Sequence, residues 1–338
     1  MSVGLDIGSK TIKIIELSKE GSRWKLRSSG IIGYKGNAPE YMKDERESVV
    51  LAEAIKKLHK EAKVSSKNIV LSLPETQVFT RTVKFPFLTD SEIASAIKWE
   101  AEQYIPIPVS EAVIQHSILE RREDLSPPQV LVLLIAVPKS LVEKYVKVVR
   151  MAGLSVVAIE TDLMAMVRVL APENQTVLLV DFGARSTNIA IAKEGQLAFS
   201  RSIPTAGDAF TRVVAQVLGV EHIQAEEYKR AYGLSGSQLE GKIKSALEPV
   251  FRLVSDEMRK AIHFYQTEEK GSPPKSVILA GGTSGMPEAI SAITRLLGLE
   301  TIIGNPFSKV AIDAEAAKTV SDYAPLYAVA VGLAMRGE

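Results

Sequence analysis

The chain has no cysteine among its 338 residues, so it forms no disulfide bond and offers no thiolate ligand to a metal ion. Histidine is scarce as well. The four that are present are scattered along the chain without the spacing of a metal site: His59, His116, His222 and His263. We therefore expect any metal ion to be held by carboxylates.

A strong charge of either sign is also missing. The formal net charge is +1 at pH 7, which excludes the basic surface of a nucleic-acid-binding protein. No apolar run approaches the roughly 18 residues of a membrane-spanning helix, the longest lying near residues 130–137. Asp6 and Lys10 interrupt the pattern of a signal peptide. We expect no direct membrane insertion, so any membrane association goes through a partner.

What the chain does have is a repeated motif. Residues 5–14 and 180–189 each combine an apolar strand ending in Asp-x-Gly, a short polar turn and a second alternating strand, which predicts a tight β-hairpin. Both hairpins precede a third strand-like run and an amphipathic helix-like run: 24–34 and 48–62 in one half, 196–203 and 208–218 in the other. The halves are related.

The two hairpins predict a polyphosphate site. Glycine lets the backbone approach a ligand closely, and successive turn N–H groups form an anion-binding concavity. Asp6 and Asp181 end the two first strands, so facing hairpins would place both carboxylates beside a Mg²⁺ that keeps its water ligands. This arrangement indicates a nucleotide held from both sides.

A third segment is compatible with the same ligand. The apolar run at 275–280 ends at Gly281 and Gly282, and a helical pattern then begins with Pro287 near its start. Free N–H groups there would suit an α-phosphate or a ribose, although a plain strand-to-helix turn with glycines for close packing has the same sequence. The segment lacks the Gly-x-Gly-x-x-Gly spacing of a dinucleotide-binding fold.

The order of hairpin, hairpin and Gly-rich turn resembles the actin-like ATPase superfamily, in which they surround ATP between two ribonuclease-H-like lobes. Within it, the chain is similar along nearly its whole length to the type IV pilus assembly protein family PilM. The most specific similarity is residues 87–108, an acidic helix containing Trp99 that ends in Tyr104, Ile105 and Pro106. Further matches are Glu160, Asp162, Ala165, Ala225, Glu226, Lys229, Glu257, Lys260, Phe264 and Tyr265.

The resemblance implies an α/β protein of the actin-like ATPase fold, with ATP and Mg²⁺ in the cleft between two lobes. It divides the chain into a first lobe (1–77), an inserted α/β subdomain (78–152), the rest of the first lobe (153–174), a second lobe (175–208), its helical subdomain (209–272), the rest of the second lobe (273–322) and a C-terminal helix that returns to the first lobe (323–338).

Carried over position by position, the resemblance implies nucleotide contacts from both hairpins, a later helix and the Gly-rich turn: Asp6, Gly8, Ser9, Lys10 and Thr11; Asp181, Gly183, Ala184, Arg185, Ser186 and Thr187; Glu226 and Lys229; Gly281, Gly282, Thr283 and Ser284. Two alternatives stay open. Lys10 and Arg185 are also ordinary hairpin-tip charges, and Glu226 with Lys229 has the spacing of a surface ion pair. At Thr283 some relatives have glycine, and we expect its side chain to narrow the nucleotide's approach.

Hydrolysis of ATP is a separate question from binding. Glu160 and Asp162 are the candidate catalytic residues, because phosphoryl transfer to water needs a group that orients the attacking water. Acidic residues that open a helix also suit its N-terminal dipole, which is the alternative. Since no clear base is present, we expect slow hydrolysis or none, with ATP as a structural or switching ligand that stabilises the fold by mass action.

The resemblance also implies a partner. PilM proteins bind the N-terminal cytoplasmic peptide of a membrane-anchored, PilN-like protein beside the inserted subdomain, which would make this protein cytoplasmic and peripheral to the inner membrane. Strand addition and apolar pockets would hold such a peptide. One face of the acidic helix fills the subdomain core in our interpretation, whereas Trp99 lies off that face and is the candidate for partner binding.

The main alternative is an FtsA-like filament protein, which shares the fold and an inserted subdomain. FtsA-type chains end in a linker and a basic amphipathic helix, whereas this sequence stops at Met335-Arg336-Gly337-Glu338, which favours the scaffold function. Self-association, or service in a related secretion or DNA-uptake machine, is compatible with the same pattern.

Overall fold

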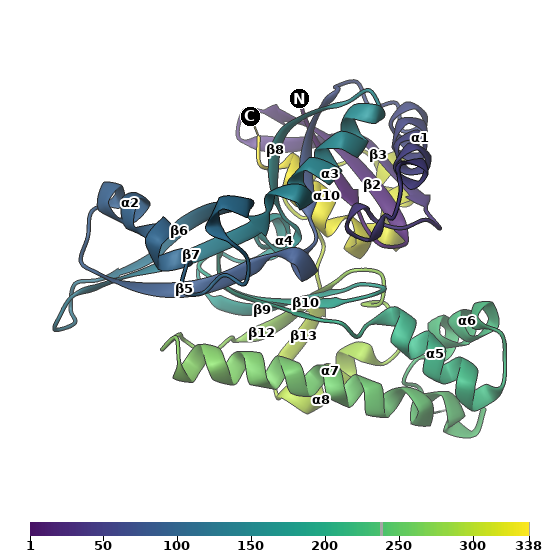
Figure 1. Ribbon diagram of the computed structural model, residues 1–338. Helices are drawn as coiled ribbons and strands as arrows, with labels where there is room; N and C mark the ends of the chain where they lie inside the picture. Colours follow the sequence, from purple (N-terminus) through teal and green to yellow (C-terminus); the bar gives the residue numbers. More distant parts are fainter. Residues whose placement is uncertain (237–238, 338) are drawn as a thin grey trace.

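The computed structural model describes residues 1–236 and 239–337, and it contains two mixed sheets that share the topology of five strands, to which the first sheet adds β14 (Figure 1). The first sheet has the order β14-β3-β2-β1-β4-β8, and the second has the order β11-β10-β9-β12-β13. In both, a meander of three antiparallel strands continues into parallel strands on the other side of the first strand. The duplication predicted from the hairpins is confirmed.

The strands of the first sheet are β1 (Ser2–Ile7), β2 (Thr11–Glu20), β3 (Arg23–Gly33), β4 (Asn68–Leu73), β8 (Ser155–Thr161) and β14 (Val310–Ala311). Those of the second are β9 (Thr176–Phe182), β10 (Thr187–Lys193), β11 (Gln196–Ile203), β12 (Ser276–Ala280) and β13 (Glu300–Ile303). A third, antiparallel sheet has the order β5-β7-β6, with β5 (Phe79–Pro86), β6 (Ala112–Arg122) and β7 (Gln129–Pro138).

Helices cover the outer faces of both main sheets and fill the space between them. The first sheet carries α1 (Glu45–Glu61) and α3 (Lys139–Met151), and the second carries α5 (Gly207–Leu218), α6 (His222–Tyr232), α7 (Lys242–Thr267) and α8 (Ala289–Leu297). Between the lobes lie α4 (Asp162–Leu170) and α10 (Ala328–Ala334), which pack on each other. A Cβ at Gly332 would approach the Ala165 carbonyl oxygen to 1.9 Å, so glycine permits this contact.

One longer helix remains, α2 (Asp90–Ala101). The other helices are short: η1 (Pro39–Tyr41), η2 (Glu75–Gln77), η3 (Val109–Glu111), η4 (Leu239–Gly241), α9 (Ala314–Val320) and η5 (Ser321–Tyr327). A capping box at Thr89 begins α2, since its side chain accepts from the Glu92 amide while Glu92 accepts from the Thr89 amide.

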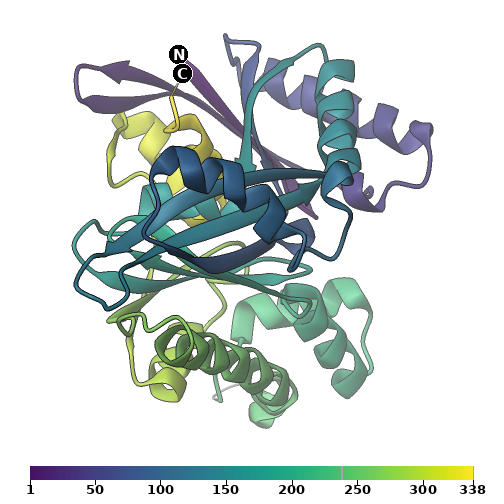
Figure 2. The same ribbon diagram turned by 60° about the vertical axis from the view of Figure 1, so that its left-hand side comes forward.

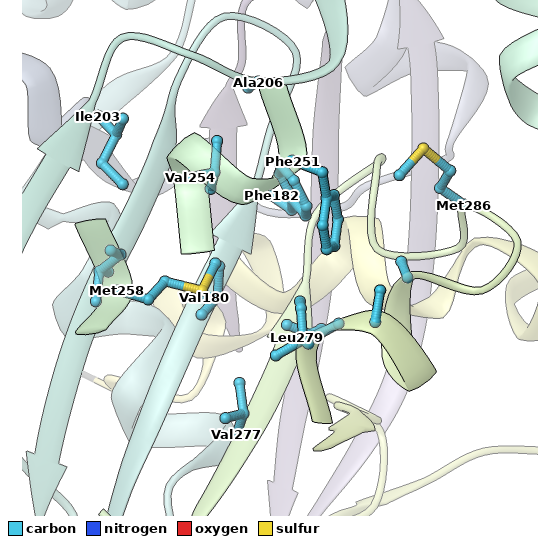
Figure 3. Close-up of a cluster of buried hydrophobic side chains, with 14 of the residues drawn as sticks. Val180, Phe182, Ile203, Ala206, Phe251, Val254, Met258, Val277, Leu279 and Met286 are labelled. Atoms are coloured by element: carbon cyan, nitrogen blue, oxygen red, sulfur yellow. The ribbon is translucent and has the colours of Figure 1, made fainter. Parts of the chain in front are cut away.

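An aromatic core supports the second hairpin (Figure 3). Phe182, at the end of β9, packs edge-to-face on Phe210 of α5 with ring centroids 5.6 Å apart, and its ring lies 6.2 Å from that of Phe251 of α7. Because side chains alternate along a strand, burying Phe182 in this core turns Asp181 to the opposite face, toward the other lobe.

The inserted sheet lies across the second lobe and does not stand free (Figure 2). One of its faces packs on α2, and Leu133 and Ile135 on the other face join the core around α4 and β9. Thr80 of β5 hydrogen-bonds Ser200 of β11 at 2.7 Å, and Lys193 of β10 pairs with Glu120 of β6 at 3.0 Å. The inserted subdomain therefore links the two lobes.

Packing moves two of the boundaries expected from the sequence. The sequence division assigns α3 to the inserted subdomain, but Leu141 and Tyr145 of α3 pack with α1 and β4 in the first-lobe core. The return to the first lobe also begins before residue 323, since Phe307 and Val310 pack with β2 and β14 pairs with β3. Both segments have apolar faces that could pack on either lobe, so the hydrophobic pattern of the sequence does not show to which lobe each one belongs.

A buried carboxylate marks the junction of the three units. Glu75 of η2 is only 3% exposed, and its Oε1 accepts a hydrogen bond of 2.5 Å from Ser200 of the second lobe. Burial raises the pKa of Glu75 to about 7, and the hydrogen bond from Ser200 offsets only part of this effect. The carboxyl is thus held where ionisation costs stability.

We predict that Glu75→Gln stabilises the protein in a pH-dependent way. In the unfolded chain Glu75 ionises near pH 4.5, whereas in the folded protein it keeps its proton until about pH 7. As the pH rises from 4.5 to about 7, the free energy of unfolding of the wild type therefore falls relative to that of the variant, by at most about 3 kcal/mol. Above about pH 7 the difference between the two proteins stays constant. Urea unfolding at several pH values measures it. Glu111→Gln, at an exposed position, is the control, and a pH-independent difference for Glu75→Gln would contradict the prediction.

Candidate nucleotide site

A cavity of about 230 Å³ lies between the lobes where the two hairpins face each other. Most residues that the sequence predicts for the nucleotide line it: Asp6, Gly8, Ser9, Lys10, Thr11, Asp181, Gly183, Ala184, Arg185, Ser186, Glu226, Lys229, Gly281, Gly282 and Thr283. Thr187 and Ser284 are not among its lining residues. The Thr187 hydroxyl donates to the Thr205 carbonyl at 2.7 Å, and the Ser284 hydroxyl donates to the Gly281 carbonyl at 2.7 Å. Both side chains stabilise loops next to the cavity.

The hairpin turns have the geometry of a phosphate cradle. Each is closed by a hydrogen bond from its glycine, Gly8 to the Thr11 carbonyl at 3.1 Å and Gly183 to the Ser186 carbonyl at 3.2 Å. In the described part of the chain, the tip amides of Ser9, Lys10, Ala184 and Arg185 donate to no backbone carbonyl. These turns therefore fit an anion, which supplies the missing acceptors.

Carboxylates form the floor of the cavity. Asp6, Asp162 and Asp181 line it, and the buried Lys13 ammonium donates to Asp6 Oδ2 at 2.9 Å. Burial raises the pKa of Asp181 to about 6, against the smaller opposing effect of Lys13. Burial and the neighbouring charge of Asp6 raise the pKa of Asp162 well above its usual value. The floor thus carries more negative charge than its single ammonium balances.

The carboxylates of this floor fit a Mg²⁺ ion that keeps water ligands. Within residues 1–236 and 239–337, no three histidine or carboxylate side chains are arranged to ligate a metal ion directly. A hydrated ion needs only hydrogen-bond acceptors from the protein, and Asp6 and Asp181 supply them.

Sequence reasoning missed Lys13. It lies in the run Ile12-Lys13-Ile14-Ile15, and a lysine inside such an apolar run is the signal that could have found it. It also missed Glu40 and Tyr41, which line the cavity from η1, and Asp208, which lines it from the first turn of α5. These residues follow the hairpins by many positions and only folding brings them to the site.

Glu160 does not lie at the cavity. Its carboxylate pairs with Arg168 through contacts of 2.5 and 2.6 Å, and Arg336 lies 3.6 Å away. Glu160 is therefore corrected from a candidate catalytic residue to a buried ion-pair partner. Of the two acidic candidates, Asp162 at the start of α4 is the one that reaches the cleft.

Glu226 and Lys229 line the cavity as part of a buried network. The Lys229 ammonium donates to the Gly207 carbonyl, to Thr211 and to Glu226 at 3.1, 3.0 and 2.7 Å, which uses all three of its protons. Burial lowers the pKa of Lys229, although Glu226 opposes the shift. Burial alone would raise the pKa of Glu226, but hydrogen bonds from Lys229 and Thr211 lower it to about 2. The pair is not a loose surface ion pair, and Lys229 positions α5 against α6.

Thr283 joins the Gly-rich turn to the second hairpin. Its hydroxyl donates to the Gly183 carbonyl at 2.9 Å, and its amide donates to the Phe182 carbonyl at 2.9 Å. Gly281 before it has a φ of +83°, and a Cβ there would lie 2.5 Å from Asp181 Oδ1. Glycine is therefore required where the turn touches the carboxylate floor.

A second cavity, of about 460 Å³, opens beside the inserted sheet. It is lined by residues of β6, β7 and α4, and by residues of the β10–β11 turn. Apolar side chains form much of its wall, with Glu173 and Lys309 also lining it: Ile118, Leu133, Ile135, Met164, Val167 and Leu197. We call it the α4 groove.

Trp99 lies away from the α4 groove. It is 74% exposed on α2, which covers the other face of the inserted sheet, while Ile93, Ile97 and Ala101 of α2 are buried as expected. The predicted core face of this helix is thus confirmed. The structure does not bring Trp99 together with the groove.

Two lobes of this topology, with paired hairpins and a Gly-rich turn around one cleft, define the actin-like ATPase fold. MreB5 of Spiroplasma citri bound to AMPPNP shares the fold, with a TM-score of 0.54 at 14% identity over 98% of this chain and 93% of that one. The sequence matches the family described as type IV pilus assembly protein PilM over residues 4–338, and the chain belongs to this family.

Individual relatives agree with this assignment. A solved chain from a PilM–PilN type IV pilus biogenesis complex is 28% identical, with a TM-score of 0.84 over 99% of this chain and 98% of that chain. The cell division protein FtsA of Pseudomonas aeruginosa is 27% identical over 282 residues, 70% of this chain. The chain spans 64% of that FtsA and 54% of FtsA from Staphylococcus epidermidis, less than two thirds of these relatives. Among the described residues, no helix is long and apolar enough to cross a membrane.

Proposed function

We propose that this protein is an ATP-binding scaffold of a type IV pilus assembly complex, in which the cleft holds Mg·ATP and the α4 groove holds a peptide of a PilN-like membrane protein. One observation carries the nucleotide part: two hairpins with free tip amides face each other above a carboxylate floor. Membership in the PilM family supports the pilus context. The protein would then be cytoplasmic and peripheral to the inner membrane.

In this proposal each part of the cleft has one role. The tip amides of both hairpins bind the phosphates, and the carboxylates of Asp6 and Asp181 hold the water ligands of Mg²⁺, which would neutralise phosphate charge when bound. Lys13 holds the Asp6 carboxylate in place through its 2.9 Å hydrogen bond. Glu226 and Arg230, which pair at 3.1 Å, face the nucleoside side of the cavity.

Slow hydrolysis of ATP, or no hydrolysis, is consistent with the same geometry. Asp162 is the carboxylate placed to orient a water molecule, but its raised pKa favours the protonated form, which is a poor acceptor for a water proton. ATP then serves mainly as a ligand that bridges the lobes and stabilises the closed protein.

We predict that Gly183→Val weakens Mg·ATP binding at least tenfold, about 1.4 kcal/mol. A Cβ at position 183 would lie 2.8 Å from the Ser186 carbonyl oxygen, so the second hairpin must deform and its amides leave the cleft. Calorimetric titration measures the affinity. Gly33→Val, where a Cβ meets nothing within 4 Å, is the matched control. Equal affinity in wild type and Gly183→Val would reject the site.

The α4 groove suits an extended apolar peptide. Strand β6 is an edge of the inserted sheet, so its outward N–H and C=O groups are available for strand addition along the groove. The apolar wall suits the side chains of such a peptide, and Lys309 is a cationic residue in the lining. The solved PilM relative comes from a complex with PilN, which supports a peptide of that protein as the ligand.

We predict that Met164→Glu abolishes binding of the N-terminal peptide of the PilN-like partner. Met164 lines the groove from the first turn of α4, where an acidic residue suits the helix dipole and the fold is preserved. Titration of the peptide in the presence of Mg·ATP measures the effect. Trp99→Ala is the comparison, because Trp99 is the partner site predicted from sequence and lies on the other face of the sheet. If Trp99→Ala abolishes binding and Met164→Glu does not, the groove is the wrong site.

An FtsA-like filament protein is the second candidate function. FtsA from Pseudomonas aeruginosa matches 70% of this chain, which is the observation in its favour. Sedimentation of the purified protein with Mg·ATP, in the absence of the peptide, would reveal polymers if this function applies.

A further inference from the structure

The two hairpin tips carry cations at equivalent positions, and each cation contacts the opposite lobe. Lys10 lies four residues after Asp6, and Arg185 lies four residues after Asp181. Both line the cleft. Neither is an isolated tip charge in solvent, because each has a partner on the other side of the cleft.

The first contact joins the first hairpin to the second lobe. The Lys10 ammonium forms an ion pair with Asp208, in the first turn of α5, and the two side chains are 44% and 26% exposed. The Asp208 amide donates to the Ala184 carbonyl at 2.8 Å, so this carboxylate is fixed directly beside the second hairpin. Lys10 therefore reaches across to the other phosphate turn.

The second contact runs in the opposite direction. The Arg185 guanidinium lies 5.4 Å from the centre of the Tyr41 ring, a cation–π geometry. Tyr41 ends η1, which precedes α1 in the first lobe, and its side chain is partly exposed. Arg185 thus contacts the first lobe as Lys10 contacts the second.

The partners are also equivalent by duplication. Tyr41 lies between β3 and α1, and Asp208 lies just after β11, at the start of α5. Each hairpin tip therefore touches the segment of the opposite lobe that runs from the third strand into the first turn of the first helix. The repeat of this contact in both directions makes a chance pairing of two surface charges a poor explanation.

We propose that these two contacts are latches that hold the cleft closed and control access of a polyphosphate to it. The inference rests on the proposed nucleotide site. In this proposal a phosphate displaces the Asp208 carboxylate from Lys10, so that binding exchanges one anion for another at the same ammonium. Partly exposed ion pairs are weak, and phosphate contacts to an ammonium are strong, which makes the exchange favourable.

Lobe separation tests the latches without any nucleotide. The chain has no cysteine, so Lys60→Cys on α1 and Glu227→Cys on α6 give two unique positions for spin labels, both at exposed sites. The test variant combines Asp208→Asn with Tyr41→Leu, which removes the latch partners and keeps the hairpin cations. The control combines Asp256→Asn with Tyr323→Leu, at exposed positions outside the cleft. We expect the test variant alone to show longer and broader label distances by double electron–electron resonance, and unchanged distances would overturn the proposal.

Association kinetics test the control of access. Stopped-flow mixing with a fluorescent ATP analogue and Mg²⁺ should give an association rate at least about threefold faster for the test variant, because a competing negative charge is gone. Equal rates in wild type and variant would overturn the role in access. If neither protein binds the analogue, the proposed nucleotide function and the control of access both fail, while the distance measurement still decides whether the contacts hold the lobes together.

Discussion

The arrangement of the cleft depends on an unequal charge balance at its floor. Asp6, Asp162 and Asp181 converge there, and Lys13 is the ammonium that contacts them. A protein that only needed stability would pair or replace such carboxylates, because uncompensated charge away from water is costly. Burial accordingly raises the pKa of Asp181 to about 6. A hydrated cation would offset this excess of negative charge at the floor. The polyphosphate that it carries would accept hydrogen bonds from the free amides of the two turns above.

The lobes that supply these carboxylates are joined in several ways. Helices α4 and α10 fill the space between the sheets, and the inserted sheet contacts β11 of the second lobe. Helix α4 connects the two candidate sites directly: Asp162, its first residue, lies in the cleft, while Met164 and Val167 line the groove. A peptide in that groove would therefore contact the same helix whose first residue, Asp162, lines the cleft.

The sequence predicts those features of the molecule that depend on residues close together in the chain. The hairpins are visible because strand alternation and Asp-x-Gly turns are short-range signals, and their repetition predicts the two lobes. Asp208 is missed because it becomes a site residue only when the two lobes come together, whereas Lys13 pairs with Asp6 across the first hairpin and is within reach of local reasoning. Glu160 is misassigned for a related reason: only packing shows that its partner is Arg168. The boundary at α3 fails because an amphipathic helix does not indicate which sheet it covers.

The central claim is that both hairpins hold one polyphosphate. Amide hydrogen exchange followed by mass spectrometry, with and without Mg·ATP, tests this most directly because it reports on each hairpin separately. If both hairpins hold one polyphosphate, Mg·ATP slows exchange at residues 8–11 and at residues 183–186 together, at the same nucleotide concentration. Protection of one hairpin alone, or of neither while the nucleotide is bound, would contradict it.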